Sequence, residues 1–345
     1  MYIPFMRRAE MGSGGGQRRK PKLGVALGAG AARGWSHIGF LQELEAQGLV
    51  PDVITGTSIG AVCGGSYAAG KLDQLEGFAR SLTRRRVFSL MDLSWSGGGI
   101  LGGSRLRARL EIELGDLLNE ELPIKFGCVA TEIGSGHEIW LTKGKLAEII
   151  RSSYALPGLL EPVRLNGRWM VDGALVNPVP VTMCRALGAD LVVAVNLSTE
   201  SYSRGSVLSD HFDTDHKPAV PPKPLNEKQI TDTSGPRGFL GMVSDGAFAL
   251  SWPFRSTKPA DTQHQSLGPG IAAVMIDAFN IMQDRVARSR LAGDPPDVLV
   301  NARVGKIGLF EFHRADELIA LGRDAAKRSM EDIRAALADL ESLST

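Results

Sequence analysis

Short apolar segments alternate with segments of helical periodicity along the chain from residue 23 onward. The apolar segments are continuous, as in strands buried on both faces of a parallel sheet. The expected strands are LGVAL (23–27), DVITG (52–56), FGCVATEI (126–133), EIWLT (138–142), RWMVDG (168–173) and DLVVAVNL (190–197). FGCVATEI and EIWLT, joined through GSGH, predict a hairpin-like excursion. The pattern therefore predicts an α/β fold with a mainly parallel central sheet sandwiched by helices.

The same periodicity divides the chain into four parts. Residues 1–22 are rich in glycine and arginine and predict a flexible basic tail, and residues 23–200 predict the α/β domain. Residues 201–269 are polar and proline-rich, too poor in apolar side chains for a core, and predict an irregular or disordered insertion. Residues 270–345 predict a helical extension that packs on the domain. It comprises a helix at 271–291 with one apolar face, a short strand in DVLVNARV and a closing helix at 315–340.

Charge is distinctive only in the N-terminal tail. The whole chain has 39 Lys and Arg against 38 Asp and Glu, a net charge of +1. A nucleic-acid binder that relies on phosphate neutralisation would usually carry a clearer basic excess, so nucleic acid is not an expected partner. The tail, in contrast, sets a group of basic side chains against the single acid Glu10; these are Arg7, Arg8, Arg18, Arg19, Lys20 and Lys22. Such a tail is either solvated or in peripheral contact with an anionic membrane surface.

Cysteine usage and hydropathy both favour a cytoplasmic protein. Cys63, Cys128 and Cys184 have no paired spacing and no nearby histidine cluster, which favours buried thiols over a disulfide or zinc framework. No apolar run reaches the roughly 18 residues that a spanning helix needs. The first twenty residues also lack the apolar core of a signal peptide.

Glycine is unusually abundant, and two glycine-rich turns follow predicted strands. The chain has 41 glycines in 345 residues, against roughly 7% on average. The segment GTSIG (56–60) fits the pattern G-x-S-x-G, which holds a serine on a sharp turn between a strand and a helix with its Oγ exposed. The N-terminus of the following helix would stabilise negative charge at Ser58. On this motif alone, Ser58 is either a nucleophile or part of a plain turn.

The second turn is LGAGAARG (27–34). A dinucleotide-binding loop would need a third glycine where Arg33 stands, and an acidic residue at the end of the next strand, where GTS occurs instead. The alternative is a turn whose unpaired backbone N–H groups bind an anion. Beside Ser58, such a turn would be an oxyanion hole for acyl transfer, with Arg33 locking the loop, balancing its dipoles or simply lying on the surface.

A serine nucleophile also needs a base. Of the histidines, only His313 has the chain order of an α/β-hydrolase triad, whereas His37 is placed for a structural role and His137 for a solvated turn. Asp172, in VDGALVNP (171–178), offers a second solution. A carboxylate on an Asp-Gly turn at a strand end could face Ser58 directly, forming a dyad without histidine.

Taken together, these motifs and their order resemble the patatin-like phospholipase family. Further similar stretches are ARGWSHIGFLQELEAQGL (32–49), SSYALPGLLEPV (152–163) and DGALVNPVPV (172–181), so the resemblance covers residues 22–200. Alanines replace some of the glycines found in the loop of plant members. This change leaves the backbone donors intact and affects only local geometry.

In that family a serine and an aspartate form a catalytic dyad, and the glycine-rich loop supplies the oxyanion hole. The resemblance therefore implies that Ser58 is the nucleophile and Asp172 the base. Gly30 and Ala31 would be the N–H donors, with Gly28 and Arg33 shaping the loop. The implied substrates are acyl esters of lipids, including phospholipids and lysophospholipids, and no metal or other cofactor is expected.

Two alternatives stay open at this stage. One is an α/β-hydrolase with a triad of Ser58, Asp172 and His313, and the other is a lipid-binding relative without turnover. The segment MDLSWSGGGILGG (91–103) is also open to two interpretations, either a mobile flap over an acyl pocket or a loose loop.

Overall fold

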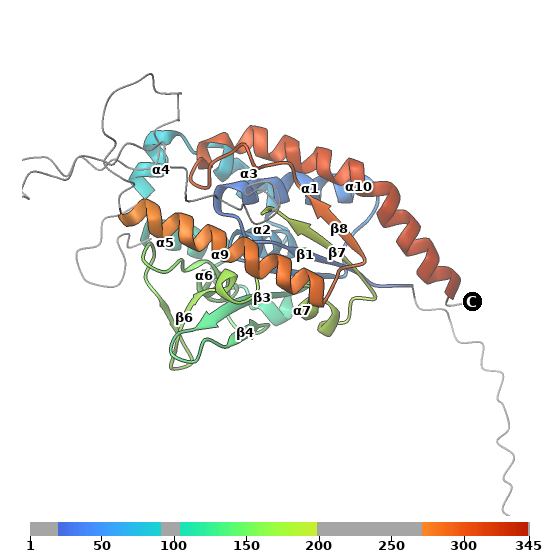
Figure 1. Ribbon diagram of the computed structural model, residues 1–345, viewed down its shortest axis with the longest axis horizontal. Coiled ribbons are helices and arrows are strands. Elements are labelled where there is room, and N and C mark those ends of the chain that lie inside the picture. The colour runs from blue at the N-terminus through green and yellow to red at the C-terminus, as the bar shows by residue number, and fades with distance from the viewer. Residues whose placement is uncertain (1–19, 91–103, 199–270, 344–345) are drawn as a thin grey trace, which may run out of the picture.

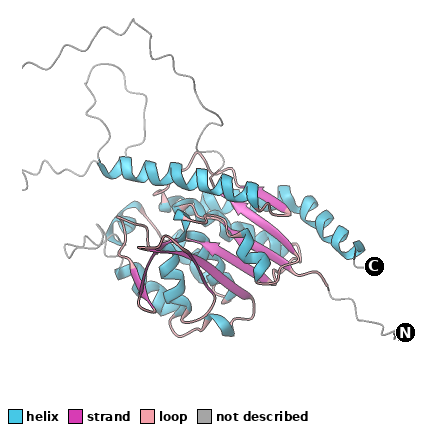
Figure 2. Cartoon of the chain, turned by 60° about the horizontal axis from the view of Figure 1, so that its bottom comes forward, coloured by secondary structure: helices cyan, strands magenta, loops and turns pink. Residues whose placement is uncertain are grey.

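The computed structural model describes residues 20–90, 104–198 and 271–343, which form one sheet covered by helices on both faces (Figures 1 and 2). The predicted insertion and the segment 91–103 lie outside the described residues, as does the predicted tail apart from residues 20–22. Within the described ranges, no helix combines the length and the apolar character needed to cross a membrane.

The sheet has eight strands in the order β5-β6-β3-β2-β1-β7-β8, with β4 paired to β3. Their bounds are β1 Leu23–Leu27, β2 Val53–Thr57, β3 Lys125–Glu132, β4 Glu138–Leu141, β5 Val163–Leu165, β6 Arg168–Asp172, β7 Leu191–Asn196 and β8 Val298–Asn301. Neighbours from β3 through β2, β1 and β7 to β8 are parallel. Strands β4 and β6 are antiparallel to β3, and β5 is antiparallel to β6. The predicted mainly parallel sheet and the hairpin of β3 and β4 are confirmed.

The α-helices connect the strands and cover both faces of the sheet. Their bounds are α1 Trp35–Ala46, α2 Ile59–Ala68, α3 Leu72–Arg80, α4 Arg84–Leu90, α5 Ser104–Leu114, α6 Leu146–Tyr154, α7 Val181–Ala186, α9 Ile271–Gly293 and α10 Ala315–Leu343. Short 3₁₀ turns add η1 Ala31–Gly34, η2 Asn119–Glu121, η3 Gly173–Leu175 and η5 Phe312–Arg314.

The core has two parts because successive side chains of a strand point to opposite faces of the sheet. Val25 and Val193 belong to the larger core, together with apolar residues of α1, α2, α6 and α10. Ala26 and Val192, one position away on the same strands, belong to a smaller core with α7 and Ala287 of α9. Continuous apolar strands are therefore required by burial on both faces.

The C-terminal extension is part of the sheet as well as a cover for it. Strand β8 pairs in parallel with β7 and forms an edge of the sheet. Helix α10, which accounts for the predicted closing helix, lies along α1 (Figure 1), and its Leu318, Ala325 and Ile333 are buried.

The orientation of α9 differs from the expectation of an apolar face turned toward the core. Side chains on the predicted apolar face are exposed to 48% at Val274, 56% at Met275 and 46% at Ile281. The polar residues Gln283 and Asp284 are instead 6% and 3% exposed. The inward face of α9 is thus partly polar: Gln283 and Asp284 line a pocket, while Ala287 belongs to the smaller core.

Candidate active site

Ser58 lies on the sharp turn that joins β2 to α2. Its backbone has φ 57° and ψ −122°, a conformation that non-glycine residues rarely adopt and that structures retain mainly at functional sites. The glycines of GTSIG permit the turn: a Cβ on Gly56 would strike the backbone of Gly60, and one on Gly60 would strike the carbonyl of Leu27. Ser58 is half-buried, with its Oγ beside the N-terminus of α2. The geometry is that of a strained nucleophile turn.

Asp172 reaches Ser58 because of strand order and register. Strand β3 runs between β2 and β6, so Thr57 lies opposite Val129 while the adjacent Ala130 lies opposite Asp172. The Ser58 Oγ donates a hydrogen bond of 2.6 Å to Oδ2 of Asp172. The other carboxylate oxygen, Oδ1, accepts from the N–H of Ala174 at 2.8 Å. The structure therefore brings together the two predicted catalytic residues, 114 positions apart in sequence.

The environment of Asp172 makes its carboxylate a better base than an exposed aspartate. The side chain is buried, and burial raises the pKa of Asp172 from 3.8 to about 6, against the opposing effect of the bonds from Ser58 and Ala174. A pKa near 6 leaves the group ionised at neutral pH while increasing its affinity for a proton.

A second serine, which the sequence analysis missed, holds the backbone at Ser58. The N–H of Ser58 donates to Oγ of Ser153 at 3.0 Å, and that hydroxyl donates to the carbonyl of Val129 at 2.6 Å. Ser153 is fully buried at the end of α6, in the SSYALP stretch. Because its own N–H is occupied, Ser58 cannot direct that group at a bound carbonyl.

Two donors are unoccupied in the glycine-rich loop. The N–H groups of Gly28 and Ala29 donate to the carbonyls of Val195 and Pro178, and that of Ala32 donates to Leu309. Among the described residues, no acceptor is bonded to the N–H of Gly30 or Ala31, between these fixed peptides. Ala31 has φ 47°, a further strained position. The predicted donors are the two amides that the loop leaves available.

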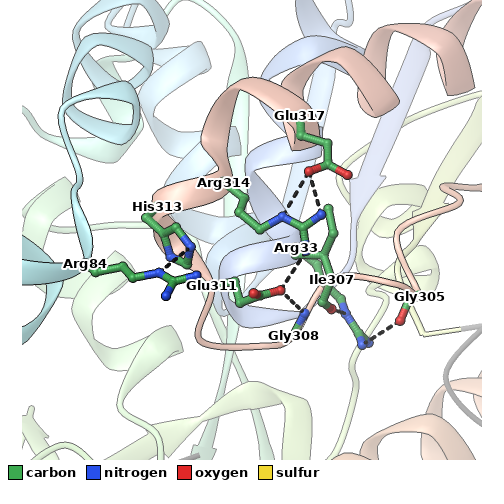
Figure 3. Close-up of polar contacts among 9 residues, drawn as sticks. All are labelled: Arg33, Arg84, Gly305, Ile307, Gly308, Glu311, His313, Arg314 and Glu317. Carbon is green, nitrogen blue, oxygen red and sulfur yellow. Dashed lines mark hydrogen bonds and ion pairs between the residues drawn. The ribbon is translucent and has the colours of Figure 1, made fainter. Parts of the chain in front are cut away.

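Arg33 fixes the loop to the C-terminal extension (Figure 3). Its Nε donates to the carbonyl of Ile307 at 2.8 Å, and its Nη2 lies 3.5 Å from the carbonyl of Gly305. In the same segment, Oε2 of Glu311 accepts from the N–H of Gly308 at 2.8 Å and from Arg314 at 2.9 Å. Of the roles predicted for Arg33, these contacts fit that of locking the loop, and residues 305–309 are its anchor.

His37 holds the other side of the loop. The ring is fully buried in α1, and its Nε2 lies 2.7 Å from the carbonyl oxygen of Gly28. Because a carbonyl oxygen only accepts, Nε2 carries the proton, which leaves Nδ1 buried with no partner in the described ranges. Burial also lowers the pKa of His37 to about 4, so the ring is neutral near pH 7. The hydrogen bond from His37 thus fixes the carbonyl group of Gly28, the glycine that was predicted to shape the loop.

His313 does not complete a triad. In Figure 3 it faces Arg84, whose Nε donates to its Nε2 at 3.2 Å, and its Nδ1 has no partner among the described residues. Both carboxylate oxygens of Asp172 are bonded to Ser58 and Ala174. Neither nitrogen of His313 therefore contacts the dyad.

The fold and site define a class of protein: an α/β protein with a serine on a strained strand-to-helix turn, a buried carboxylate as its partner, and adjacent unpaired amides. A family model described as patatin-like phospholipase matches residues 25–185. The chain is 34% identical over 338 residues to an uncharacterized NTE family protein of Mycobacterium tuberculosis, covering 90% of this chain and 92% of that protein. This chain belongs to the patatin-like phospholipase family.

Other similar proteins match over shorter shares of their length. A lysophospholipase, NTE1 of Saccharomyces cerevisiae, is 34% identical over 203 residues, 56% of this chain and 12% of that protein. A putative patatin-like phospholipase domain-containing protein of Caenorhabditis elegans is 31% identical over 328 residues, 90% of this chain and 26% of that protein. The crystal structure of VipD from Legionella pneumophila matches with a TM-score of 0.41 and 18% identity, covering 54% of this chain and 51% of that one.

Proposed function

We propose that this protein is a serine hydrolase that cleaves acyl ester bonds of lipids, of the phospholipase A, lysophospholipase or carboxylesterase type, with Ser58 and Asp172 as its dyad. The observation that carries the proposal is the 2.6 Å hydrogen bond from the strained Ser58 to the buried carboxylate of Asp172. Membership of the patatin-like phospholipase family supports lipid esters as the substrate class. A relative named as a lysophospholipase agrees with this class.

In the first half-reaction, Ser58 attacks the ester carbonyl carbon while its proton passes to Oδ2 of Asp172. The carbonyl oxygen becomes an oxyanion, which accepts hydrogen bonds from the N–H groups of Gly30 and Ala31. When the tetrahedral intermediate collapses, the bond to the alcohol oxygen breaks. That oxygen takes the proton from Asp172, so the alcohol leaves and Ser58 remains acylated.

In the second half-reaction, water replaces the alcohol. Asp172 accepts a proton from the water as it attacks the acyl-serine carbonyl, and the same two amides bind the new oxyanion. Collapse breaks the bond to Ser58 Oγ, which recovers its proton from Asp172, and the fatty acid leaves. The dyad returns to its starting protonation state, and every proton transfer uses one carboxylate.

A lipid-binding protein of the same fold without turnover is the alternative. Two observations favour hydrolysis: the backbone strain at Ser58 and the raised pKa of Asp172 are both features typical of catalytic sites, and simple lipid binding requires neither. Peripheral contact of the basic tail with an anionic membrane stays a prediction from the sequence, since the tail lies outside the described residues apart from 20–22.

The test is labelling with a fluorophosphonate probe, combined with hydrolysis of p-nitrophenyl esters and of lysophospholipids. The wild-type protein should be labelled and active, and Ser58→Ala should be neither. Ser81→Ala is the matched control, because it removes a serine hydroxyl bonded to the carbonyl of Phe78 in α3, away from the dyad. Equal labelling of wild type and Ser58→Ala would move the nucleophile elsewhere. A folded wild type that binds lipid but hydrolyses no ester would support the lipid-binding alternative.

A further inference from the structure

The C-terminal end of α6 contacts both members of the proposed dyad. The N–H of Ser58 donates to Oγ of Ser153 at 3.0 Å. The N–H of Asp172 donates to the carbonyl of Ala155 at 2.9 Å. Ser58 follows β2 and Asp172 ends β6, and β3 lies between these two strands in the sheet. Residues 153–155 therefore bridge, from outside the sheet, the ends of two strands that β3 separates.

The hydroxyl of Ser153 is fixed on both sides. The side chain is fully buried, and its Oγ donates to the carbonyl of Val129 at 2.6 Å. A serine hydroxyl has a single proton, so this bond leaves its acceptor lone pairs for the N–H of Ser58. In the register of β2 and β3, Val129 lies opposite Thr57, the residue that precedes Ser58. The hydroxyl thus links the end of β3 to the turn that follows β2.

The position of this hydroxyl is set by the packing of α6 on its neighbours. A Cβ added to Gly65 of α2 would lie 2.5 Å from Cδ1 of Ile150, so α6 approaches α2 closely at this glycine. The thiol of Cys128 in β3 donates to the carbonyl of Ile149 at 3.3 Å. Beyond the last helical residue, Ala155 has ψ 77°, outside the helical region. The end of α6 is therefore held by α2 and β3 independently of the dyad.

We propose that residues 153–155 position the dyad, an inference that rests on the proposed function. The Ser153 hydroxyl holds the strained backbone of Ser58 so that Oγ stays beside the carboxylate, and the Ala155 carbonyl fixes the backbone that carries this carboxylate. A non-glycine residue at φ 57° persists only where surrounding contacts hold it. Ser153 bonds the backbone of Ser58 and not its reacting Oγ, so it is a positioning residue.

The kinetic test compares two adjacent, equally buried serines of α6. Ser153→Ala removes the acceptor of the Ser58 N–H, whereas Ser152→Ala removes a hydroxyl that donates to the carbonyl of Glu148 in the same helix. In Ser153→Ala, kcat for a p-nitrophenyl ester should fall about tenfold or more, because a buried donor left unpaired costs about that factor. KM should stay within about twofold, since the hydroxyl acts on the nucleophile and not on bound substrate. Ser152→Ala should keep both constants within about twofold of wild type.

The pKa of Asp172 gives a second measurement, which needs no turnover. The hydrogen bond from Ser58 lowers this pKa against the larger effect of burial, which raises it to about 6. If Ser153→Ala displaces the Ser58 hydroxyl, the lowering effect weakens and the pKa rises further. Carbon NMR of labelled aspartate should then show the carboxyl group of Asp172 titrating at higher pH, and the acidic side of the kcat/KM profile should move with it. Ser152→Ala should leave the titration unchanged.

The two measurements separate this inference from the proposed function. A wild type that hydrolyses no ester rejects the proposed function, and the NMR titration of the two alanine variants then decides the positioning role alone. A folded Ser153→Ala protein with either wild-type kcat or an unchanged Asp172 pKa overturns the inference, as do equal changes in Ser152→Ala. If Ser153→Ala fails to fold, Ser153→Cys replaces it, because a thiol of similar shape is a much weaker acceptor. The same fall in kcat and rise in pKa are then expected, and wild-type values overturn the inference.

Discussion

The guanidinium of Arg33 donates a hydrogen bond to the carbonyl oxygen of Ile307 across 274 positions of sequence. One position earlier in the loop, the N–H of Ala32 donates to the carbonyl of Leu309 at 2.9 Å. The glycine-rich loop and the segment after β8 are therefore one structural unit. A substitution in the segment after β8 should therefore shift the amides of Gly30 and Ala31, the proposed oxyanion donors, without altering the contact between Ser58 and Asp172.

Glu311→Gln should lower kcat by about three- to tenfold with little change in KM. The substitution weakens the bonds from Gly308 and Arg314 that stiffen the loop anchor, and a lost charge-assisted bond is worth roughly 1 kcal/mol. Glu317→Gln is the control, because Glu317 binds the same Arg314 at 2.6 Å but makes no contact with residues 305–309. Steady-state kinetics with p-nitrophenyl butyrate measures both. Equal losses in the two variants would assign the effect to Arg314 alone.

The pH profile should follow Asp172. Only the ionised carboxylate accepts the Ser58 proton, so kcat/KM should rise with pH through about 6, where the raised pKa lies, and level off above it. A histidine base would titrate close to the same pH, so the profile alone does not separate the two. Its temperature dependence does, because a carboxyl pKa hardly changes with temperature whereas an imidazole pKa falls on warming. The profile is therefore measured at about 10 °C and at about 40 °C. If the pKa read from its acidic side shifted strongly between these temperatures, a carboxylate base would be contradicted.

Asp172→Asn should abolish turnover yet stabilise the fold at alkaline pH. The folded pKa of about 6 is above the ordinary 3.8, so the native state binds more protons than the unfolded state between these values. Stability from this group is present at low pH and is lost as pH rises through 6, by on the order of 3 kcal/mol. The side chain of the Asp172→Asn variant does not ionise, so this variant does not lose stability as the pH rises. Urea denaturation at pH 8 should give a larger free energy of unfolding for Asp172→Asn than for wild type, and at pH 4 the advantage should vanish. A less stable variant at pH 8 would refute the account.

His37 should act as a positioning residue for the glycine-rich loop. His37→Phe leaves the Gly28 carbonyl without its hydrogen-bond donor. Because an unpaired buried carbonyl costs about 1–3 kcal/mol, the loop should lose its position and kcat should fall about tenfold or more. His37→Gln, which keeps an N–H donor, should recover part of that loss. The measurement is kcat and KM for all three proteins, together with their free energies of unfolding. If Phe and Gln lose kcat equally while remaining folded, the hydrogen bond has no catalytic role.

His313→Ala should change kcat/KM by no more than about twofold, as expected of a partly exposed side chain outside the dyad. Within the part of the chain that the structure describes, its imidazole is bonded to Arg84 alone, and no step of the dyad mechanism uses an imidazole. A folded but inactive His313→Ala enzyme, together with an active Asp172→Asn enzyme, would replace the dyad with a histidine-based mechanism.

The local parts of this site were predictable from sequence because each depends on a few neighbouring residues. The strand-turn-helix around Ser58 needs glycines on either side, and the apolar strands reveal which segments form the sheet. That these elements meet is a consequence of sheet order: the predicted motifs at 27–34, 56–60 and 171–178 converge because β1, β2, β3 and β6 are neighbours. The resemblance to a known family implied that Ser58 and Asp172 pair, but it was not used to predict the order of the strands.

What could not be predicted depends on long-range contacts between ordinary residues. Ser153 is one of two adjacent serines, and nothing in its local sequence shows that its hydroxyl meets the N–H of Ser58. Strand β5, with three residues, is too short to stand out from its loop. The apolar periodicity of α9 was real, but periodicity does not reveal which face meets the protein, and here polar Gln283 and Asp284 point inward.

The contact between Arg33 and Ile307 also sets the order in which activity can arise during synthesis. During synthesis the glycine-rich loop, Ser58 and Asp172 emerge before the C-terminal extension, and N-terminal segments begin to fold first. The carbonyls that fix the glycine-rich loop belong to residues 305–309, which emerge only after α9 and β8. A nascent chain that has not yet reached residues 305–309 therefore holds Ser58, Asp172 and the glycine-rich loop without the contacts that fix this loop, and the proposed site is complete only once that segment has been synthesised.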